Sequence, residues 1–312
     1  YYDYGTATGV FNTPSTSSEI FLPAAPSGTA RIYVDANGSF NLQNQTIAFG
    51  SGSYLRIAAS TSSPGNKFSV YGFSNPSTIA TFRFLVRFAD SDGNGTPTSG
   101  VVRIVIGNGS SFSDNSSMNT TQSFAGISTE FKNTYMTTEY LQGGTWVAAS
   151  GEPILKGGTY TIDIYCNNTA FDHNYDYGGT ISLPAYTYDV WLNGVLQGTE
   201  KPKGDLPVGT AINSFMIIAE GSTSNAANAF IDNISYTNAL AAAPLPVELT
   251  TFTASSVSGI VNLNWATATE VSNYGFDVER SADKSVWNKI GFVAGNGNSN
   301  SVKSYSYSDN TA

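Results

Sequence analysis

Charged residues, cysteine and histidine are scarce in this sequence of 312 residues. Only 12% of the residues are charged, and 23 acidic against 14 basic residues leave a net charge of -9 with no basic cluster. Proteins that bind nucleic acids or anionic membranes gather Lys and Arg on one surface, so the sequence predicts neither partner. No apolar run approaches the roughly 20 residues that cross a bilayer, so it also predicts no membrane span.

The lack of cysteine and histidine excludes further kinds of site. Cys166 is the only cysteine, so it forms no internal disulfide, and His173 is the only histidine. One Cys and one His cannot build a structural zinc site. No Gly-x-Ser-x-Gly turn offers His173 a nucleophile, so the sequence favours an exposed loop there over a catalytic relay.

Paired carboxylates are also missing. Glycosidases of the sandwich class need two facing carboxylates, commonly from a Glu-x-Asp-x-x-Glu run on one strand, and no such run occurs. The glutamates of the first 240 residues are scattered instead: Glu19, Glu130, Glu139, Glu152, Glu200 and Glu220. We expect a protein that is not an enzyme, with a glycoside hydrolase as a minor alternative because facing carboxylates can come from distant strands.

Strand signals run through the first 240 residues. The 18 Tyr, 18 Phe and 31 Gly favour pleated sheets and tight turns. Between residues 80 and 90, Phe82, Phe84, Val86 and Phe88 alternate with Arg83 and Arg87, which is typical of a half-buried strand. The Asn193-Gly194 turn predicts a hairpin. Only residues 123–142 show a helical spacing, and their Thr and Asn residues weaken that helix.

An Ala/Pro-rich stretch, NALAAAPLPV, divides the chain. It cannot continue a sheet, so we predict a first domain at 1–238, a linker at 239–246 and a second domain at 247–312. The second domain contains five short runs with strand patterns, as expected of a small sandwich. The predicted fold class is all-β.

The second region resembles the fibronectin type III-like module of large secreted proteins from Bacteroidetes-type bacteria. The matching residues are LPVELT at 245–250, Trp265, Thr269-Glu270, the GFDVERS run at 275–281 and Gly295 to Asn298. That module often precedes a type IX secretion sorting domain. The resemblance therefore implies secretion and placement at the cell surface, and it implies no reaction.

The same resemblance implies two further strands after residue 309, which the sequence lacks. One explanation is that the sequence is clipped and that any export signal before YYDYGTATG is likewise already removed. The other is that a neighbouring copy supplies the missing strand, which would give head-to-tail strand addition and a surface filament.

The first region more loosely resembles a concanavalin-like or laminin-G-like jelly roll. The resemblance rests on YDVWLNGVLQG at 188–198 and AFIDNISYTN at 229–238. Such folds bind carbohydrates, adhere to surfaces or form shells, so the fold does not fix the function.

Two loops carry candidate ligand sites. Phe171, Asp172, Asn174, Tyr175 and Tyr177 combine aromatic faces for sugar rings with polar groups for hydroxyls, which predicts a glycan site. The alternative is that these tyrosines only cover a sheet face.

The second loop is DSDGNG at 90–95. Asp90, Asp92 and Asn94 offer oxygen ligands at alternate positions, as in the first half of a calcium loop. Val101 stands where such a loop would carry its bidentate Glu, so calcium would need help from backbone carbonyls. Otherwise this segment is a solvated hairpin loop.

From these observations we expect a secreted structural or adhesive protein, assembled by strand donation between copies. A carbohydrate-binding module of a secreted protein is the alternative.

Overall fold

The computed structural model describes residues 2–44, 47, 49–50, 52–150, 154–242, 249–257, 259–267, 270–282, 284–299 and 302–310. It divides into two compact units, Tyr1–Ala241 and Ala242–Ala312. The division falls within the predicted linker at 239–246. Residues 243–248, which hold the rest of that linker and the start of LPVELT, lie outside the described residues, as does Thr269.

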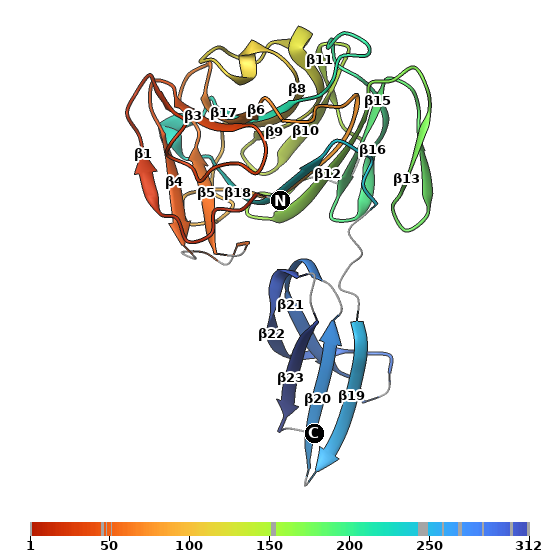
Figure 1. Cartoon of the computed structure of the whole chain (residues 1–312). Helices are drawn as coiled ribbons and strands as arrows, with labels where there is room; N and C mark the ends of the chain where they lie inside the picture. The colour runs from red at the N-terminus through yellow and green to blue at the C-terminus, as the bar shows by residue number, and fades with distance from the viewer. Residues whose placement is uncertain are drawn as a thin grey trace. The chain divides into compact units, whose positions relative to one another are not determined.

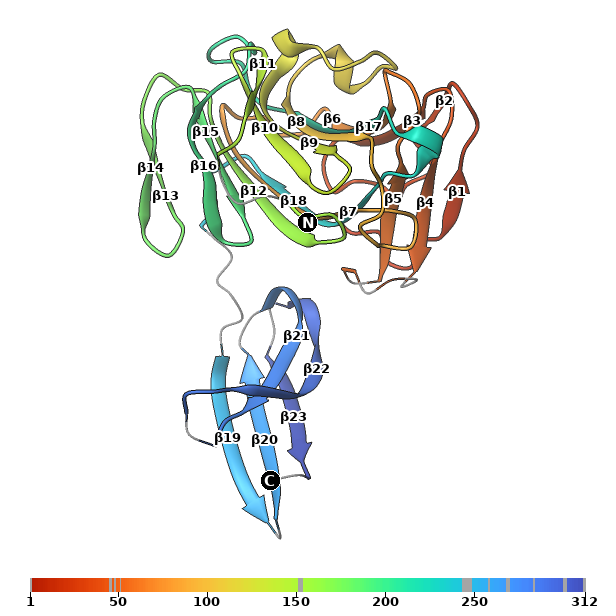
Figure 2. The same cartoon turned by 180° about the vertical axis from the view of Figure 1, so that it is seen from behind.

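Unit 1 is a sandwich of two eight-stranded sheets (Figures 1 and 2). Sheet I runs in the order β1 (Gly9–Phe11), β4 (Ser39–Asn44), β5 (Ser53–Ala58), β18 (Asn228–Thr237), β7 (Ile79–Ala89), β12 (Thr159–Asn167), β15 (Thr187–Leu192) and β16 (Val195–Pro202). Sheet II runs in the order β11 (Thr145–Ala148), β10 (Met136–Gln142), β9 (Ser123–Phe131), β8 (Val101–Gly107), β17 (Ser214–Glu220), β6 (Asn66–Tyr71), β3 (Thr29–Val34) and β2 (Thr16–Ser18).

Smaller elements complete unit 1. A separate two-stranded sheet is formed by β13 (His173–Asp176) and β14 (Thr180–Leu183). Short 3₁₀ helices occur at η1 (Ser110–Phe112), η2 (Thr120–Gln122) and η3 (Thr223–Asn225). No described helix has the length and apolarity that a bilayer span requires.

The order of the strands is jelly-roll-like, which confirms the predicted fold class. The last strand of the unit, β18, pairs between β5 and β7, and the strand before it, β17, pairs between β6 and β8. These pairings are antiparallel. Residues close to the end of unit 1 therefore lie in the middle of both sheets, beside segments from its beginning.

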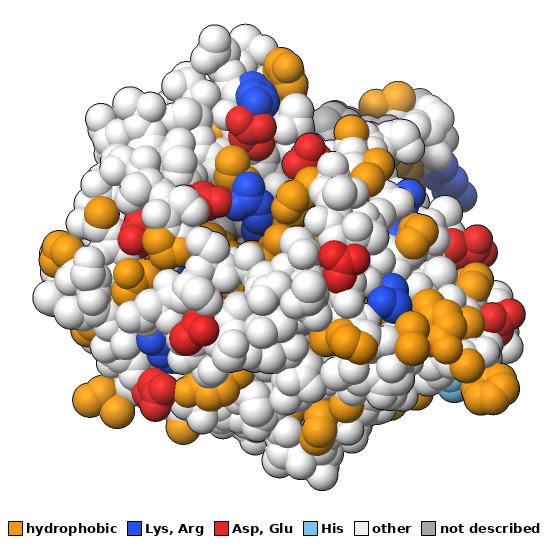
Figure 3. Space-filling view, turned by 90° about the horizontal axis from the view of Figure 1, so that it is seen from above, with side chains coloured by type: hydrophobic (Ala, Val, Ile, Leu, Met, Phe, Trp, Pro, Cys, Tyr) orange, Lys and Arg blue, Asp and Glu red, His pale blue; other side chains and the backbone are white. Residues whose placement is uncertain are grey.

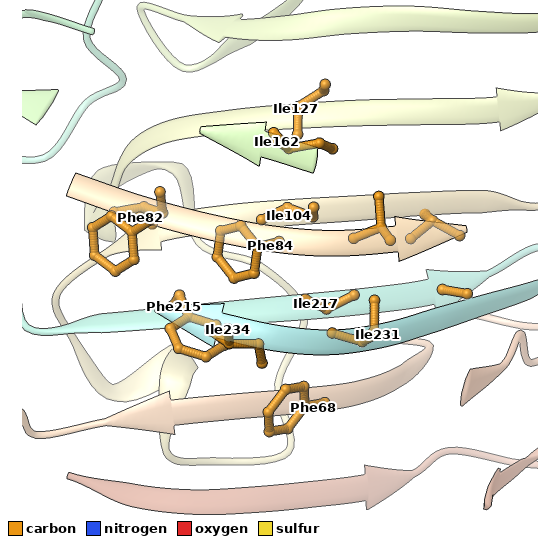
Figure 4. Close-up of a cluster of buried hydrophobic side chains, with 14 of the residues drawn as sticks. Phe68, Phe82, Phe84, Ile104, Ile127, Ile162, Phe215, Ile217, Ile231 and Ile234 are labelled. Atoms are coloured by element: carbon orange, nitrogen blue, oxygen red, sulfur yellow. The ribbon is translucent and has the colours of Figure 1, made fainter. Parts of the chain in front are cut away.

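The core lies between the two sheets and is rich in aromatic residues. Phe82 and Phe84 of β7 face Phe215 of β17, and the rings of Phe84 and Phe215 meet edge to face at 5.2 Å (Figure 4). The four apolar side chains that alternate along β7 are all buried, as the pattern predicted. Each such buried side chain contributes about 1.5–3 kcal/mol, so the core needs no disulfide.

The helical alternative for residues 123–142 is wrong, because this segment is the β9–β10 hairpin. The register of β9 against β8 shifts at Phe124, so an extra residue is inserted there. That bulge lets both Phe124 and Ala125 enter the core, and it produces the spacing that imitated a helix. The predicted turn at Asn193-Gly194 does join β15 to β16.

Unit 2 contains the five strands that the sequence predicted. One sheet has the order β19 (Leu249–Val257), β20 (Ile260–Thr267) and β23 (Lys303–Asp309). The second pairs β21 (Glu270–Arg280) with β22 (Asn288–Ser299). The indole of Trp265 on β20 meets Phe276 of β21 at 5.3 Å, so aromatic residues form the small core between these sheets.

Candidate functional site

One end of the unit 1 sandwich holds a pocket of about 320 Å³, which we call the end pocket. Phe73, Phe82 and Tyr236 form part of its wall, and Ser74, Asn75 and Asn238 are among its polar lining residues. The walls come from the segment before β3, the loop after β6, the start of β7 and the end of β18. None of the described lining residues is charged.

Two parallel rings fix the shape of the end pocket. Tyr236 stacks on Phe73 with centroids 4.4 Å apart and planes inclined by 12°. The Tyr236 hydroxyl donates to the carbonyl oxygen of Ser27 at 2.5 Å and accepts from the Ser27 N–H at 3.1 Å. Burial raises the pKa of Tyr236, which keeps this hydroxyl protonated. The ring is therefore held in one orientation.

Ser27, Ser74, Asn75 and Asn238 form the polar rim of the end pocket. The hydroxyls of Ser27 and Ser74 are hydrogen-bonded at 2.8 Å, and the Ser74 N–H donates to Ser27 Oγ at 2.9 Å. The side chains of Asn75 and Asn238 are exposed. A sugar residue needs an apolar face for its C–H groups and amide or hydroxyl partners for its own hydroxyls, and this pocket offers both.

The predicted aromatic site at 171–177 adopts a different arrangement from the one expected. Tyr175 lies in β13 and Tyr177 directly follows it, and both rings pack against sheet I instead of facing solvent. Tyr175 is only 4% exposed. Phe171 lies before the strand and is 75% exposed, and Asn174 points to solvent. Asp172 accepts a hydrogen bond from the N–H of Ala185.

Tyr175 and Tyr177 take part in a buried network of rings and carboxylates. Tyr175 stacks on Tyr165 at 3.9 Å and donates its hydroxyl to Asp189 Oδ2 at 2.6 Å. Tyr177 stacks on Trp191 at 3.6 Å and donates its hydroxyl to Asp163 Oδ2 at 2.8 Å.

Two further contacts complete this network. Arg83 forms a bidentate ion pair with Asp163, and the Trp191 indole N–H donates to the Tyr175 oxygen at 2.9 Å. Burial raises the pKa of Asp189, although hydrogen bonds from Tyr175 and the Glu200 N–H oppose that shift.

The Asp90 loop is closed by its own hydrogen bonds. Asp90 Oδ1 accepts from the N–H groups of Asp92 and Asn94 at 2.9 and 2.8 Å, and Oδ2 accepts from the Thr96 hydroxyl at 2.6 Å. Partial burial opposes ionisation of Asp90, but these hydrogen bonds outweigh it and lower the pKa of the carboxyl. A calcium ion at this loop would have to compete with the Thr96 hydroxyl.

The only histidine, His173, begins β13, and the only cysteine, Cys166, lies in β12. His173 Nε2 lies 3.0 Å from the Thr169 hydroxyl, in β13 rather than in the expected loop. Cys166 is buried, and burial raises the pKa of its thiol well above the ordinary value. Among the described residues, no three His, Cys, Asp or Glu side chains gather where they could hold a metal ion.

Unit 2 has an apolar groove of about 200 Å³ between its two sheets. Leu249, Phe252, Leu263, Trp265, Phe276 and Val278 line it. Leu249 and Phe252 are 51% and 59% exposed, which is unusual for residues that face a core. Trp265 is 4% exposed and its indole N–H is buried without a hydrogen-bond acceptor.

No protein-family model and no curated protein matches the chain. Solved structures that resemble it include a sialidase, with a TM-score of 0.41 and 13% identity over 66% of this chain. A cellulose-induced protein has a TM-score of 0.37 and 12% identity, covering 73% of this chain and 93% of that one.

A legume lectin-like domain from Entamoeba histolytica has a TM-score of 0.34 and 8% identity, covering 66% of this chain and 86% of that one. The chain spans 16% of the length of the sialidase. Similarity at this level says nothing about a ligand, so the functional argument rests on the sites themselves.

Sequence reasoning missed the end pocket. Its local signals in the sequence are Phe73, close to Asn75-Pro76, and the SYTN run at 235–238, where β18 ends. Tyr236 and Ser27 are 209 positions apart in the sequence, and the packing of sheet I, which holds β18, on sheet II, which holds β3, brings them together.

Proposed function

We propose that the chain is an extracellular, non-catalytic carbohydrate-binding protein whose end pocket receives one residue of an uncharged glycan. The observation that carries this proposal is the Phe73–Tyr236 stack set among amide and hydroxyl groups. The described lining has no carboxylate pair for hydrolysis and no cation for a uronate or a sialic acid, which supports a neutral ligand and no reaction.

The rim asparagines give the sharpest test. Asn75→Ala and Asn238→Ala each remove an exposed amide and should weaken binding of a neutral glycan about five- to tenfold. Asn133→Ala removes an exposed amide from the segment between β9 and β10 and should leave the affinity unchanged. A glycan array should first identify the ligand, and an array of neutral microbial and plant sugars without a single hit would refute the proposal.

Placement at the surface of a Bacteroidetes-type bacterium is part of the same proposal. It is supported by the fibronectin-like residues of unit 2 and by a polar surface of low charge. On the face shown in Figure 3, Lys and Arg side chains do not gather into a patch. Protease added to intact cells should digest the protein, whereas protection until the cells are lysed would contradict surface exposure.

Assembly into a filament is the second candidate, and unit 2 carries it. Among the described residues β21 forms a ladder with β22 alone, and the apolar groove lies beside it. In this arrangement a strand from a neighbouring copy pairs with β21 and fills the groove. One of its carbonyl oxygens accepts a hydrogen bond from the Trp265 indole N–H. Micrographs and size exclusion at several concentrations should show polymers, and a strictly monomeric folded chain would exclude self-assembly.

A further inference from the structure

Among the described residues of unit 1, no strand of sheet I or sheet II pairs with the β13–β14 hairpin. It forms its own two-stranded sheet, beside β15 and β16 at one side of the sandwich (Figures 1 and 2). The Asn167 side-chain amide fixes both ends of the segment through the carbonyl oxygens of Phe171, Leu183 and Pro184. Between these fixed ends, side chains make the contacts described between the hairpin and sheet I, so the hairpin can lift without breaking a strand ladder.

The surface under the hairpin is an ordered pattern of rings and carboxylates. On β12 and β15, Ile164 and Val190 point into the core, while the residues on either side of each point outward. In the register of the two strands, Tyr165 is opposite Asp189, and Asp163 is opposite Trp191. Each aromatic ring therefore has a carboxylate beside it on the neighbouring strand.

The two hairpin tyrosines occupy this surface in the same way. Tyr175 lies flat on Tyr165, with an interplanar angle of 15°, and Tyr177 lies flat on Trp191, with an angle of 9°. Each hydroxyl donates to the carboxylate next to the ring on which it stacks. A flat ring on an aromatic face with a hydroxyl on a carboxylate is also how a protein holds a pyranose.

We propose that Tyr165, Trp191, Asp163 and Asp189 form a second, covered carbohydrate-binding face, and that Tyr175 and Tyr177 fill it in place of two sugar rings. The hairpin is then a cover that a glycan displaces. This face shares no residue with the end pocket, so the proposal does not rest on the proposed function of that pocket.

The charges define the class of ligand. Two carboxylates would repel uronates and sialylated sugars, and Arg83 is already paired with Asp163. The ligand is therefore a neutral oligosaccharide that presents two adjacent rings. Burial under the hairpin raises the pKa of Asp189, because the hairpin keeps water away from this carboxylate. When the hairpin lifts, a sugar hydroxyl or water can donate to the carboxylate in place of Tyr175.

The test removes the two rings that act as internal ligands. A Tyr175→Ser/Tyr177→Ser variant should bind neutral oligosaccharides on an array about ten- to a thousandfold more tightly than wild type, because a cover open in about 0.1–10% of molecules lowers the apparent affinity by that fraction. Adding Trp191→Ala should abolish the gain. Tyr175→Phe/Tyr177→Phe keeps both stacks and should give a smaller gain.

A further variant distinguishes glycan binding at the covered face from glycan binding at the end pocket. Asn75→Ala/Asn238→Ala in the opened protein should leave the gain intact, whatever it does to wild-type binding. A folded double serine variant that binds no glycan more tightly than wild type would overturn the cover, as would a gain that survives Trp191→Ala.

Hydrogen exchange on the wild-type protein decides the matter if the serine variant does not fold. The β13–β14 amides should exchange through a local opening, faster than the amides of β12 and β15. Exchange of the hairpin only together with those central strands would show that it is a fixed part of the fold and overturn the proposal.

Discussion

Tyr236 joins the end of β18 to the segment before β3, because its hydroxyl both donates to the carbonyl oxygen of Ser27 and accepts from the Ser27 N–H. These two hydrogen bonds hold the ring that forms one wall of the end pocket. The same ring packs on Phe73, so packing and hydrogen bonding fix it independently.

Tyr236→Phe separates these two contributions. It keeps the stack on Phe73 and removes both hydrogen bonds, and it leaves the Ser27 N–H without its partner. We expect the free energy of unfolding to fall by about 1–2 kcal/mol, measured by urea denaturation, with a modest loss of glycan affinity. Phe73→Ala should weaken glycan binding more than Tyr236→Phe does, and equal affinities for these two variants would contradict the role given to the stack.

Sequence patterns gave the strands of unit 1 where a sheet has one buried face. Phe82, Phe84 and Val86 share one face of β7, with Arg83 and Arg87 on the other, because one side of β7 faces the core, and that period is visible in the sequence. The bulge at Phe124 was not visible, because an inserted residue is defined by its partner strand β8. A local spacing cannot distinguish such a bulge from a helical turn.

The sites were harder to predict than the strands. The sequence placed Tyr175 and Tyr177 together in a loop, as part of a glycan site or as rings that only cover a sheet face, and in the structure both rings pack on sheet I. The types of residue in a segment do not say whether solvent or protein covers their rings, and here Tyr165 and Trp191 cover them. The end pocket is formed by segments of both sheets that are distant in the sequence, so no window of sequence contains it.

Removing one member of the buried ion pair tests the network under the hairpin. Arg83 and Asp163 have side chains that are 12% and 2% exposed. Arg83→Met leaves the Asp163 carboxylate buried without its cation, and we expect the free energy of unfolding to fall by about 3–5 kcal/mol. Arg83→Met/Asp163→Leu removes both charges and should be more stable than Arg83→Met alone, by thermal or urea unfolding.

Calcium binding at the Asp90 loop is tested by a matched substitution. If Asp90, Asp92 and Asn94 hold calcium, the midpoint of thermal unfolding should rise with calcium concentration and fall on addition of a chelator. Asp92→Asn keeps the size of the side chain and removes one negative charge, so it should abolish the rise. A wild-type midpoint that ignores both calcium and chelator would eliminate the site.

Tyr140 gives the protein a defined sensitivity to alkali. Its side chain is 3% exposed, and burial raises the pKa of Tyr140 from the ordinary value of 10.0 to about 12. The folded state therefore holds the phenol proton more tightly than the unfolded state. The stability that results is fully present below pH 10 and is lost as the pH rises from 10 to about 12.

Tyr140→Phe isolates this contribution, because other buried tyrosines titrate in both proteins. Relative to the variant, the unfolding free energy of the wild type should fall across pH 10 to 12 by at most about 1.4 kcal/mol per pH unit. Below pH 10 the difference between the two proteins should not change with pH. Urea denaturation in a series of alkaline buffers measures this difference in unfolding free energy. Curves that stay parallel over the whole pH range would show that the pKa of Tyr140 is the same in the folded and the unfolded state.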